Sequence, residues 1–306
     1  MPEPLTKILD HIVHLTPPGT VNLVSQQFRD LGFKVIPGGR HAEGLTENAL
    51  VVLPDGAYLE LISFIYPASH YPPGSPERHR RETMPWSEAY KYPGWIDYAF
   101  LGASNRSGVS ISHIINERGR ADGSGVRYNH EVSGGRVRAD GKVLEWVITT
   151  PSVQSDEGQE GRGALPFFCG DVTPREWRVP LDPPSNSEHP SGVLGIAHVK
   201  VLVAPEWLDR FSAQLTSVIG DPPSESSSSP HSPSEYTWLL ETPLSKGSGT
   251  SRPHLILSAP VDEEERSYVA ERGPGIFEVS FWVKHGSKEG ASTTPYGRIT
   301  WQVISM

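Results

Sequence analysis

A histidine and a glutamate in the first 60 residues have the residue types and spacing of a metal or acid–base site. His11 lies in the apolar run 8–15 and Glu60 in the apolar run 58–64, and side chains alternate across a strand. Glu60 is then the one charged residue on its strand face, where a carboxylate is costly to bury without a partner. Histidine and glutamate are ordinary ligands of zinc, iron, manganese and nickel. The pair therefore predicts either a metal site, with Glu60 also in a catalytic role, or a structural ion pair.

Other polar and aromatic residues are candidates for catalysis or substrate binding. His41 follows a pair of glycines, whose missing side chains let the backbone approach a ligand closely. Because imidazole titrates near neutral pH, we predict His41 as a ligand or general base, the alternative being a solvated loop histidine. Asn48 shares a strand face with apolar residues, where a polar group either pins a loop or binds substrate. Tyr58 and Trp95 are predicted to line a substrate pocket, with core packing as the alternative for Trp95.

The hydrophobic pattern indicates the elements that would position these residues. Residues 8–15 and 58–64 read as strands, and residues 21–31 repeat apolar side chains at helical spacing before Gly32, which is placed to end a helix. A Pro-Asp-Gly turn follows the apolar run 49–53 and predicts a hairpin. The predicted order over the first 65 residues is strand, helix, strand, strand, strand.

Four short motifs, in this order along the chain, resemble the glyoxalase-like branch of the vicinal oxygen chelate superfamily. They are Leu9-Asp10-His11-Ile12, Gly38-Gly39-Arg40-His41, Thr46-Glu47-Asn48-Ala49-Leu50 and Gly56-Ala57-Tyr58-Leu59-Glu60-Leu61-Ile62. The resemblance implies an α+β fold of repeated βαβββ modules, whose curved mixed sheets surround a cleft. In metal-using members of that superfamily, the ligands come from the first and last strands of paired modules.

The resemblance also implies a ligand set. Carried over by position, His11 and Glu60 fall on the two ligand places of the first module. The corresponding places of the second module fall near Asp97 and Phe167, and phenylalanine cannot bind a metal. A third ligand would therefore have to be His41, Asp97 or His198, and His198 is chosen here together with His11 and Glu60.

An internal repeat is predicted in the last third of the chain. Counted from His11 and from His198, both segments have a proline seven residues on and large apolar residues 17 and 20 residues on. In this third module, Ile256 stands where Glu60 stands in the first, and Glu278 is the nearest carboxylate. The alternative for His198 is a core histidine with its hydrogen bonds satisfied.

The domain organisation follows from this repeat and from composition. We expect paired glyoxalase-like modules over residues 1–172, a proline-rich linker over 173–190, and a third module with a partial fourth over 191–306. The last part contains a Ser/Pro-rich loop at residues 221–235.

Composition excludes several classes of protein. With 27 Lys and Arg against 36 Asp and Glu, the net charge of −9 disfavours a nucleic-acid partner. The apolar stretches are too short to cross a bilayer, so no membrane association is expected. A single cysteine, Cys169, allows no internal disulfide, which fits the cytoplasm. The expected partners are a small-molecule substrate and, for a homodimer, a second copy of the chain.

The function predicted from the resemblance is that of a metal-dependent enzyme acting on a small oxygenated metabolite. A divalent ion (Zn, Ni, Mn or Fe) would chelate two neighbouring oxygens of the substrate, and lyase, isomerase and dioxygenase chemistry all fit that arrangement. The alternative is a protein of the same fold that binds or sequesters a small molecule without a metal. An inactive interaction scaffold is a third possibility.

Overall fold

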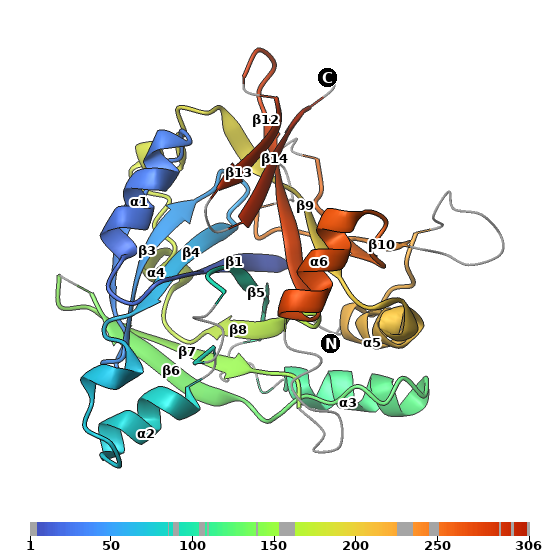
Figure 1. The fold of residues 1–306 in the computed structure, drawn as a ribbon, viewed down its shortest axis with the longest axis horizontal. Helices are drawn as coiled ribbons and strands as arrows, with labels where there is room; N and C mark the ends of the chain where they lie inside the picture. Colours follow the sequence, from blue (N-terminus) through green and yellow to red (C-terminus); the bar gives the residue numbers. More distant parts are fainter. Residues whose placement is uncertain are drawn as a thin grey trace.

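The computed structural model contains two curved sheets that pack side by side (Figure 1). The described residues are 5–84, 86–87, 92–103, 108, 110–138, 140–152, 163–224, 235–244, 251–287, 289–294 and 297–304. Within them, the N-terminal half of the chain forms an eight-stranded sheet and the C-terminal third forms a six-stranded sheet.

The eight-stranded sheet consists of two modules with the same order of elements. The first contains β1 (Leu9–Thr16), α1 (Val21–Asp30), β2 (Ile36–Arg40), β3 (Thr46–Val52) and β4 (Tyr58–Phe64). The second contains β5 (Gly94–Leu101), α3 (Ile111–Ala121), β6 (Val132–Val137), β7 (Val143–Thr149) and β8 (Phe167–Asp171). A short helix, α2 (Pro76–Thr83), and a 3-10 turn (Ala68–His70) connect them. The predicted strand, helix, strand, strand, strand order is therefore confirmed.

The two modules are related by an approximate two-fold at the centre of the sheet. The strand order is β2-β3-β4-β1-β5-β8-β7-β6, and β1 pairs with β5 in antiparallel fashion, with Ile12 opposite Tyr98. The residues just before this pair are His11 and Asp97. The parallel pairs β1–β4 and β5–β8 then give Glu60 and Phe167 equivalent positions.

The sheet curves until its edge strands β2 and β6 meet. His41 and Arg136 form an antiparallel bridge, and the Ala42 N–H donates to the Gly135 carbonyl at 3.1 Å. The eight strands therefore form a nearly closed barrel whose inward-facing side chains enclose a space. The expected α+β fold of βαβββ modules with curved mixed sheets is confirmed.

The six-stranded sheet repeats part of this plan. It contains β9 (Val193–Leu202), α5 (Leu208–Ile219), β10 (Glu235–Leu239), β11 (His254–Ser258), α6 (Glu263–Arg272), β12 (Gly275–Val283), β13 (Gly290–Thr294) and β14 (Gly297–Val303). Its order is β10-β11-β9-β12-β14-β13. β9 pairs parallel with β11 and antiparallel with β12, as β1 does with β4 and β5, and His198 stands opposite His254 where His11 stands opposite Tyr58. Most of the Ser/Pro-rich loop, residues 225–234, lies outside the described residues.

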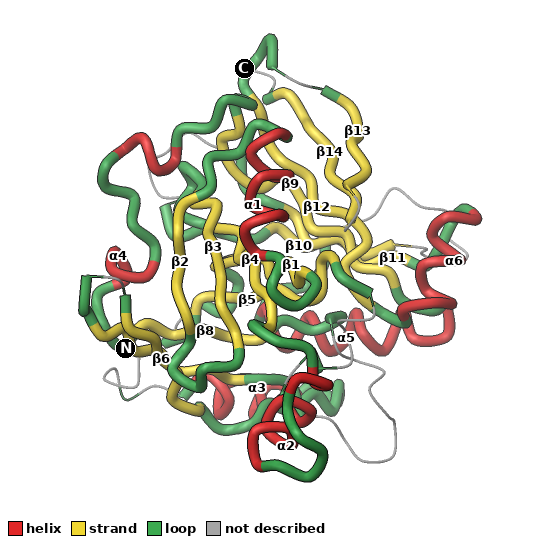
Figure 2. Tube along the Cα trace, turned by 60° about the vertical axis from the view of Figure 1, so that its left-hand side comes forward, coloured by secondary structure: helices red, strands yellow, loops and turns green. Residues whose placement is uncertain are grey.

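One large apolar core joins the two sheets. Phe28 of α1, the following Phe33, and Phe281 and Trp301 of the second sheet belong to it, and ring pairs such as Phe33–Phe281, with centroids 5.1 Å apart, link the parts. Figure 2 shows the strands of the two sheets side by side, with α1 over their junction.

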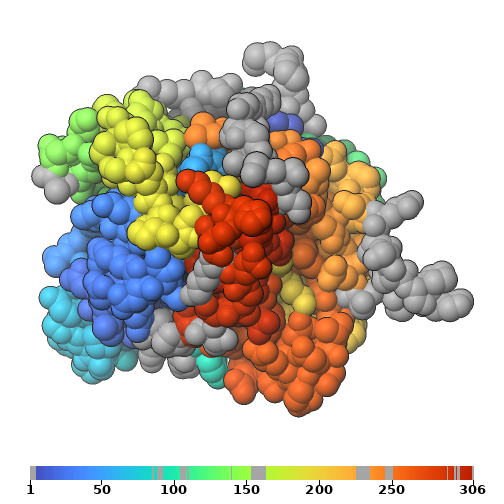
Figure 3. Space-filling view, turned by 90° about the horizontal axis from the view of Figure 1, so that it is seen from above, coloured from blue at the N-terminus to red at the C-terminus, as the bar shows by residue number. Residues whose placement is uncertain are grey.

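The segment 173–190 connects the two sheets and packs against the first, where Val179 joins a cluster with Leu50 and Tyr58. It contains the short helix α4 (Arg175–Arg178) and a 3-10 turn (Pro184–Ser187), and a further 3-10 turn (Pro205–Trp207) precedes α5. His189 contacts the carbonyl of Val52 in β3. In the space-filling view this segment, in yellow, lies between the blue N-terminal module and the red C-terminal strands (Figure 3).

Candidate functional site

The interior of the barrel holds a cavity of about 790 Å³. Strand alternation turns one face of β1, β3, β4, β7 and β8 toward it, which is why residues two apart along a strand line it together. The polar residues lining it include His11, His41, Asn48, Tyr58, Glu60, Asp97 and Arg136. The apolar residues lining it include Leu50, Ile62, Trp146, Ile148 and Phe167. Five of the predicted site residues, His11, His41, Asn48, Tyr58 and Glu60, therefore come together here.

Glu60 lies at the centre of the polar group and is 8% exposed. Its Oε2 is 3.7 Å from His11 Nε2, and its Oε1 is 3.6 Å from His41 Nε2. Asn48 Nδ2 donates a hydrogen bond to Oε1 at 2.5 Å, while Asn48 Oδ1 accepts from the Gly39 N–H at 3.0 Å. Asn48 thus ties the glutamate to the glycine turn that carries His41.

The orientation of His11 is determined by the residue before it. His11 Nδ1 is 2.7 Å from Asp10 Oδ2, and Asp10 is completely buried in ion pairs with Arg175 and Arg178. Burial by itself would raise the pKa of Asp10, but the two arginines outweigh it and hold that pKa well below its usual value. An ionised carboxylate can only accept, so Nδ1 of His11 carries a proton and the other nitrogen faces Glu60.

His41 is held in the same way by a hydroxyl. Its Nδ1 is 2.8 Å from Thr46 Oγ1, and that hydroxyl donates to Glu43 Oε1. Because the single hydroxyl proton is used on Glu43, the Nδ1 of His41 must donate to Thr46. The Nε2 of His41 then faces Oε1 of Glu60, whereas the Nε2 of His11 faces Oε2.

Two imidazole nitrogens and a carboxylate therefore face one another. With both Nδ1 atoms protonated, neutral rings would present two lone pairs to an anion, an arrangement that calls for a shared proton or a metal ion. Donor atoms around one ion at roughly 2.0–2.2 Å lie about 3 Å apart, closer than these nitrogens lie to Glu60. Among the described residues, no group of three or more His, Cys, Asp or Glu side chains already stands close enough to hold an ion.

Two other cavity residues complete the polar lining. The ring of Tyr58 stacks on that of His11, with centroids 4.6 Å apart, and its hydroxyl accepts from Arg178 Nη1 at 2.8 Å. Burial raises the pKa of Tyr58 well above its usual value, so the phenol stays protonated. Asp97, the two-fold counterpart of His11, accepts from Trp86 Nε1 at 3.0 Å.

Trp95 does not line the cavity, contrary to the predicted substrate-binding role. It is 3% exposed, packs edge-on against His14 and Phe28, and donates from Nε1 to the Arg298 carbonyl at 3.1 Å. The reason is a bulge in β5: Asp97 pairs with Val13, but Trp95 pairs with His14. The bulge moves Trp95 to the outer face of the barrel, where it joins the core between the sheets.

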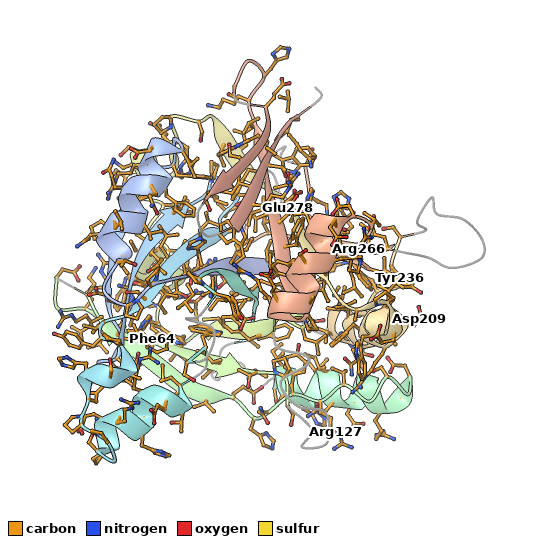
Figure 4. The ribbon with its side chains drawn as sticks, viewed as in Figure 1. Phe64, Arg127, Asp209, Tyr236, Arg266 and Glu278 are labelled. Atoms are coloured by element: carbon orange, nitrogen blue, oxygen red, sulfur yellow. The ribbon has the colours of Figure 1, made fainter. Side chains whose placement is uncertain are left out.

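His198 is not brought near His11 and Glu60, contrary to the predicted ligand set. It lies on β9 of the second sheet, where its Nε2 is 2.8 Å from Glu278 Oε1. Figure 4 labels Glu278, which belongs to β12. Burial would raise the pKa of Glu278, but hydrogen bonds from His198 and Arg298 lower it to about 2. His198 therefore belongs to a separate ion-paired group.

Sequence reasoning missed Arg136 and the support of His11 by Asp10 and Arg178. Asp10 stands in the quoted motif next to His11, so a charge within an apolar run was a usable signal. Arg136 follows two glycines on an edge strand with no apolar alternation. Its place in the cavity depends on barrel closure, which no local pattern marks.

The fold is that of the vicinal oxygen chelate class. The sequence profile of the glyoxalase-like domain family matches residues 9–219, and the chain belongs to this family. A search of curated proteins finds no match. Within the described residues, none of the helices combines the length and hydropathy needed to cross a bilayer.

Solved structures resemble this fold at low sequence identity. A hypothetical protein from Staphylococcus aureus is 10% identical with a TM-score of 0.64, over 97% of this chain and 99% of that one. A mutant of 4-hydroxymandelate synthase from Streptomyces coelicolor is 13% identical with a TM-score of 0.48, over 92% and 72% of the two chains. Methylmalonyl-CoA epimerase from Mycobacterium tuberculosis is 14% identical with a TM-score of 0.30, over 56% and 91%. The first of these shares the fold of this chain.

Proposed function

We propose that the protein is a metal-dependent enzyme of the vicinal oxygen chelate type that acts on a small oxygenated metabolite in the barrel cavity. The observation that carries this proposal is the convergence of His11 Nε2 and His41 Nε2 on the two oxygens of Glu60. Hydrogen bonds at Nδ1, to Asp10 for His11 and to Thr46 for His41, fix the orientation of both rings. Their Nε2 atoms are therefore available to a cation in the site.

The donor set fits a divalent ion in its chemistry. His11 and Glu60 would hold the metal, and His41 or Asp97, which also line the cavity, would supply a further ligand. When bound, the ion would act as a Lewis acid toward two neighbouring oxygens of the substrate and stabilise enolate-like charge. Lyase, isomerase and dioxygenase reactions share this requirement.

The residues around the metal ligands have separate roles in this proposal. His41, if it is not a ligand, moves a proton at Nε2, because Thr46 and Glu43 hold its Nδ1 proton in place. Asn48 orients Glu60, and Tyr58 keeps the His11 ring in position by stacking. The apolar wall of Trp146, Ile148 and Phe167 excludes water from the substrate.

A metal-free binding protein is the second candidate. The spacing of the donor atoms favours it, because no three His, Cys, Asp or Glu side chains in the described ranges lie close enough to hold an ion. The size and the apolar walls of the cavity also favour it. In that case His11 and Glu60 form a buried ion pair that shares a proton.

Metal content and metal-dependent stability distinguish the two candidates. Untagged protein is purified, its metal content is measured by mass spectrometry, and its melting temperature is recorded after EDTA treatment and after adding zinc, nickel, manganese or ferrous iron. We expect about one ion per chain and a stabilisation of about 2.7 kcal/mol when the free ion is at 100 times its Kd. Protein that copurifies with no divalent metal and gains no stability from any of them would contradict the enzyme proposal.

A further inference from the structure

Arg136 is a buried cation whose hydrogen bonds are incomplete. Arg136 is only 5% exposed, and its Nη1 has no hydrogen-bond partner among the described residues. Arg136 also forms no ion pair with any carboxylate in the described part of the chain. A buried charge without a partner is costly, so a folded protein keeps one where something else supplies the partner.

The fold places this guanidinium in the wall of the cavity. The bridge between Arg136 and His41 closes the barrel, and both side chains line the same space as Glu60. Nη1 lies over Gly39, where a side-chain carbon would stand 3.1 Å away, so the glycine leaves room for the arginine. Arg136 thus lies where β2 and β6 meet, and it lines the same cavity as the predicted site residues His41 and Glu60.

No carboxylate of the described residues forms an ion pair with Arg136, although the charge of Glu60 acts on it. Burial lowers the pKa of Arg136, while Tyr58 and Glu60 raise it, and a guanidinium remains charged at neutral pH. The Glu60 carboxylate is occupied by Asn48 and faces the two histidines. The remaining polar position at Nη1 is therefore available to a ligand in the cavity.

We propose that Arg136 binds a carboxylate group of the substrate, so that the metabolite is a small oxygenated carboxylic acid with an apolar body. This assignment rests on the proposed function only in taking the ligand to be a substrate. A singly charged carboxylate matches one unpaired guanidinium nitrogen, whereas a phosphate dianion would bring a second charge toward Glu60 and Asp97. The apolar walls at Trp146, Ile148 and Phe167 fit the rest of the molecule.

The test compares acids with neutral analogues of the same shape on metal-free protein. Benzoate, 3-phenylpropanoate and octanoate are titrated calorimetrically in EDTA, each against its primary amide, with phenyl phosphate as the dianion. We expect the wild type to bind at least one acid about tenfold or more tightly than its amide, since hydrogen bonds to charged groups are worth that much. Arg136→Gln should remove the preference. Arg40→Gln is the matched control: it removes the same charge from the exposed end of β2, and the preference should persist.

A second variant separates ligand recognition from a structural role. Arg136→Met keeps the volume and removes the unpaired cation, so its melting temperature should equal or exceed that of the wild type. The proposal is overturned if no acid is preferred over its amide, or if phenyl phosphate binds tenfold more tightly than every acid. It is also overturned if Arg136→Met lowers the melting temperature while the preference for acids persists in Arg136→Gln. Because these titrations contain no metal, the carboxylate preference can survive even if the metal-dependent enzyme proposal fails. Loss of metal binding in Glu60→Gln should likewise leave the preference intact.

Discussion

His11 and Asp10 are neighbours in the chain at a point where the pairing of β1 with β5 is irregular, and His11 Nδ1 and Asp10 Oδ2 are 2.7 Å apart. The contact connects the cavity to the buried ion pairs of Asp10 with Arg175 and Arg178. It also leaves His11 Nε2 facing Glu60 at 3.7 Å. The position of the predicted metal ligand therefore depends on a charge network that includes Arg178, which also lines the cavity.

Replacing Glu60 by Gln should weaken metal binding about 100-fold or more, because the substitution removes a direct ligand and even outer residues contribute 10- to 100-fold. The fold should persist, since an amide can still accept from Asn48. Metal affinity is measured by competition with a chelator. His198→Gln is the control and should leave metal affinity unchanged, because His198 pairs with Glu278 in the other sheet. Wild-type metal affinity in the Glu60 variant would show that the ion is held elsewhere.

Asp10→Asn should destabilise the protein by about 3–5 kcal/mol, the cost of removing one charged partner from a buried ion-pair group. Arg178 is buried and Asp10 is one of its carboxylate partners. Urea unfolding measures the change. Asp140→Asn breaks an exposed pair with Arg138 and should cost less than about 1 kcal/mol. Equal effects of the two substitutions would refute the role assigned to Asp10.

His189 should make the protein sensitive to mild acid. Its Nδ1 accepts from the Lys34 N–H and its Nε2 donates to the Val52 carbonyl, and burial lowers its pKa to about 4. The unfolded chain takes up this proton near pH 6.5, so the stability contribution is complete above that pH and is lost as the pH falls toward 4.

The loss attributable to His189 should reach about 2 kcal/mol between pH 7 and pH 5. Urea unfolding at the two pH values gives this quantity when the wild type is compared with His189→Gln, which cannot titrate. The variant should lose less stability on acidification than the wild type. Identical pH dependence in the two proteins would mean that His189 is protonated equally in the folded and unfolded states.

Cys169 should be unreactive in the folded protein even though it lines the cavity. Burial raises the pKa of its thiol to about 12, so the thiolate that reacts with alkylating agents is nearly absent at pH 8. Intact-mass measurement after iodoacetamide treatment should find unmodified native protein and fully modified protein in urea. Rapid alkylation of the native protein would contradict this and make Cys169 a candidate nucleophile.

Local patterns were sufficient for the first half of the site. Alternation along two apolar runs placed His11 and Glu60 on inward faces, and the parallel pairing of β1 with β4 brought those faces together. The same reasoning put Ile256 at the Glu60 position of the third module, as the pairing of Lys200 with Ile256 and of Val13 with Glu60 confirms. These features depend on spacing within a strand, which the sequence carries directly.

The rest of the site was decided by contacts between distant segments. A single bulge between Asp97 and Trp95 turned the tryptophan outward, and the separation of the two sheets kept His198 away from the cavity. Barrel closure joined His41 to Arg136, almost a hundred residues later in the chain. Strand periodicity determines which face a side chain occupies, but strand curvature, bulges and edge pairing determine which faces meet, and these depend on the packing of the whole chain.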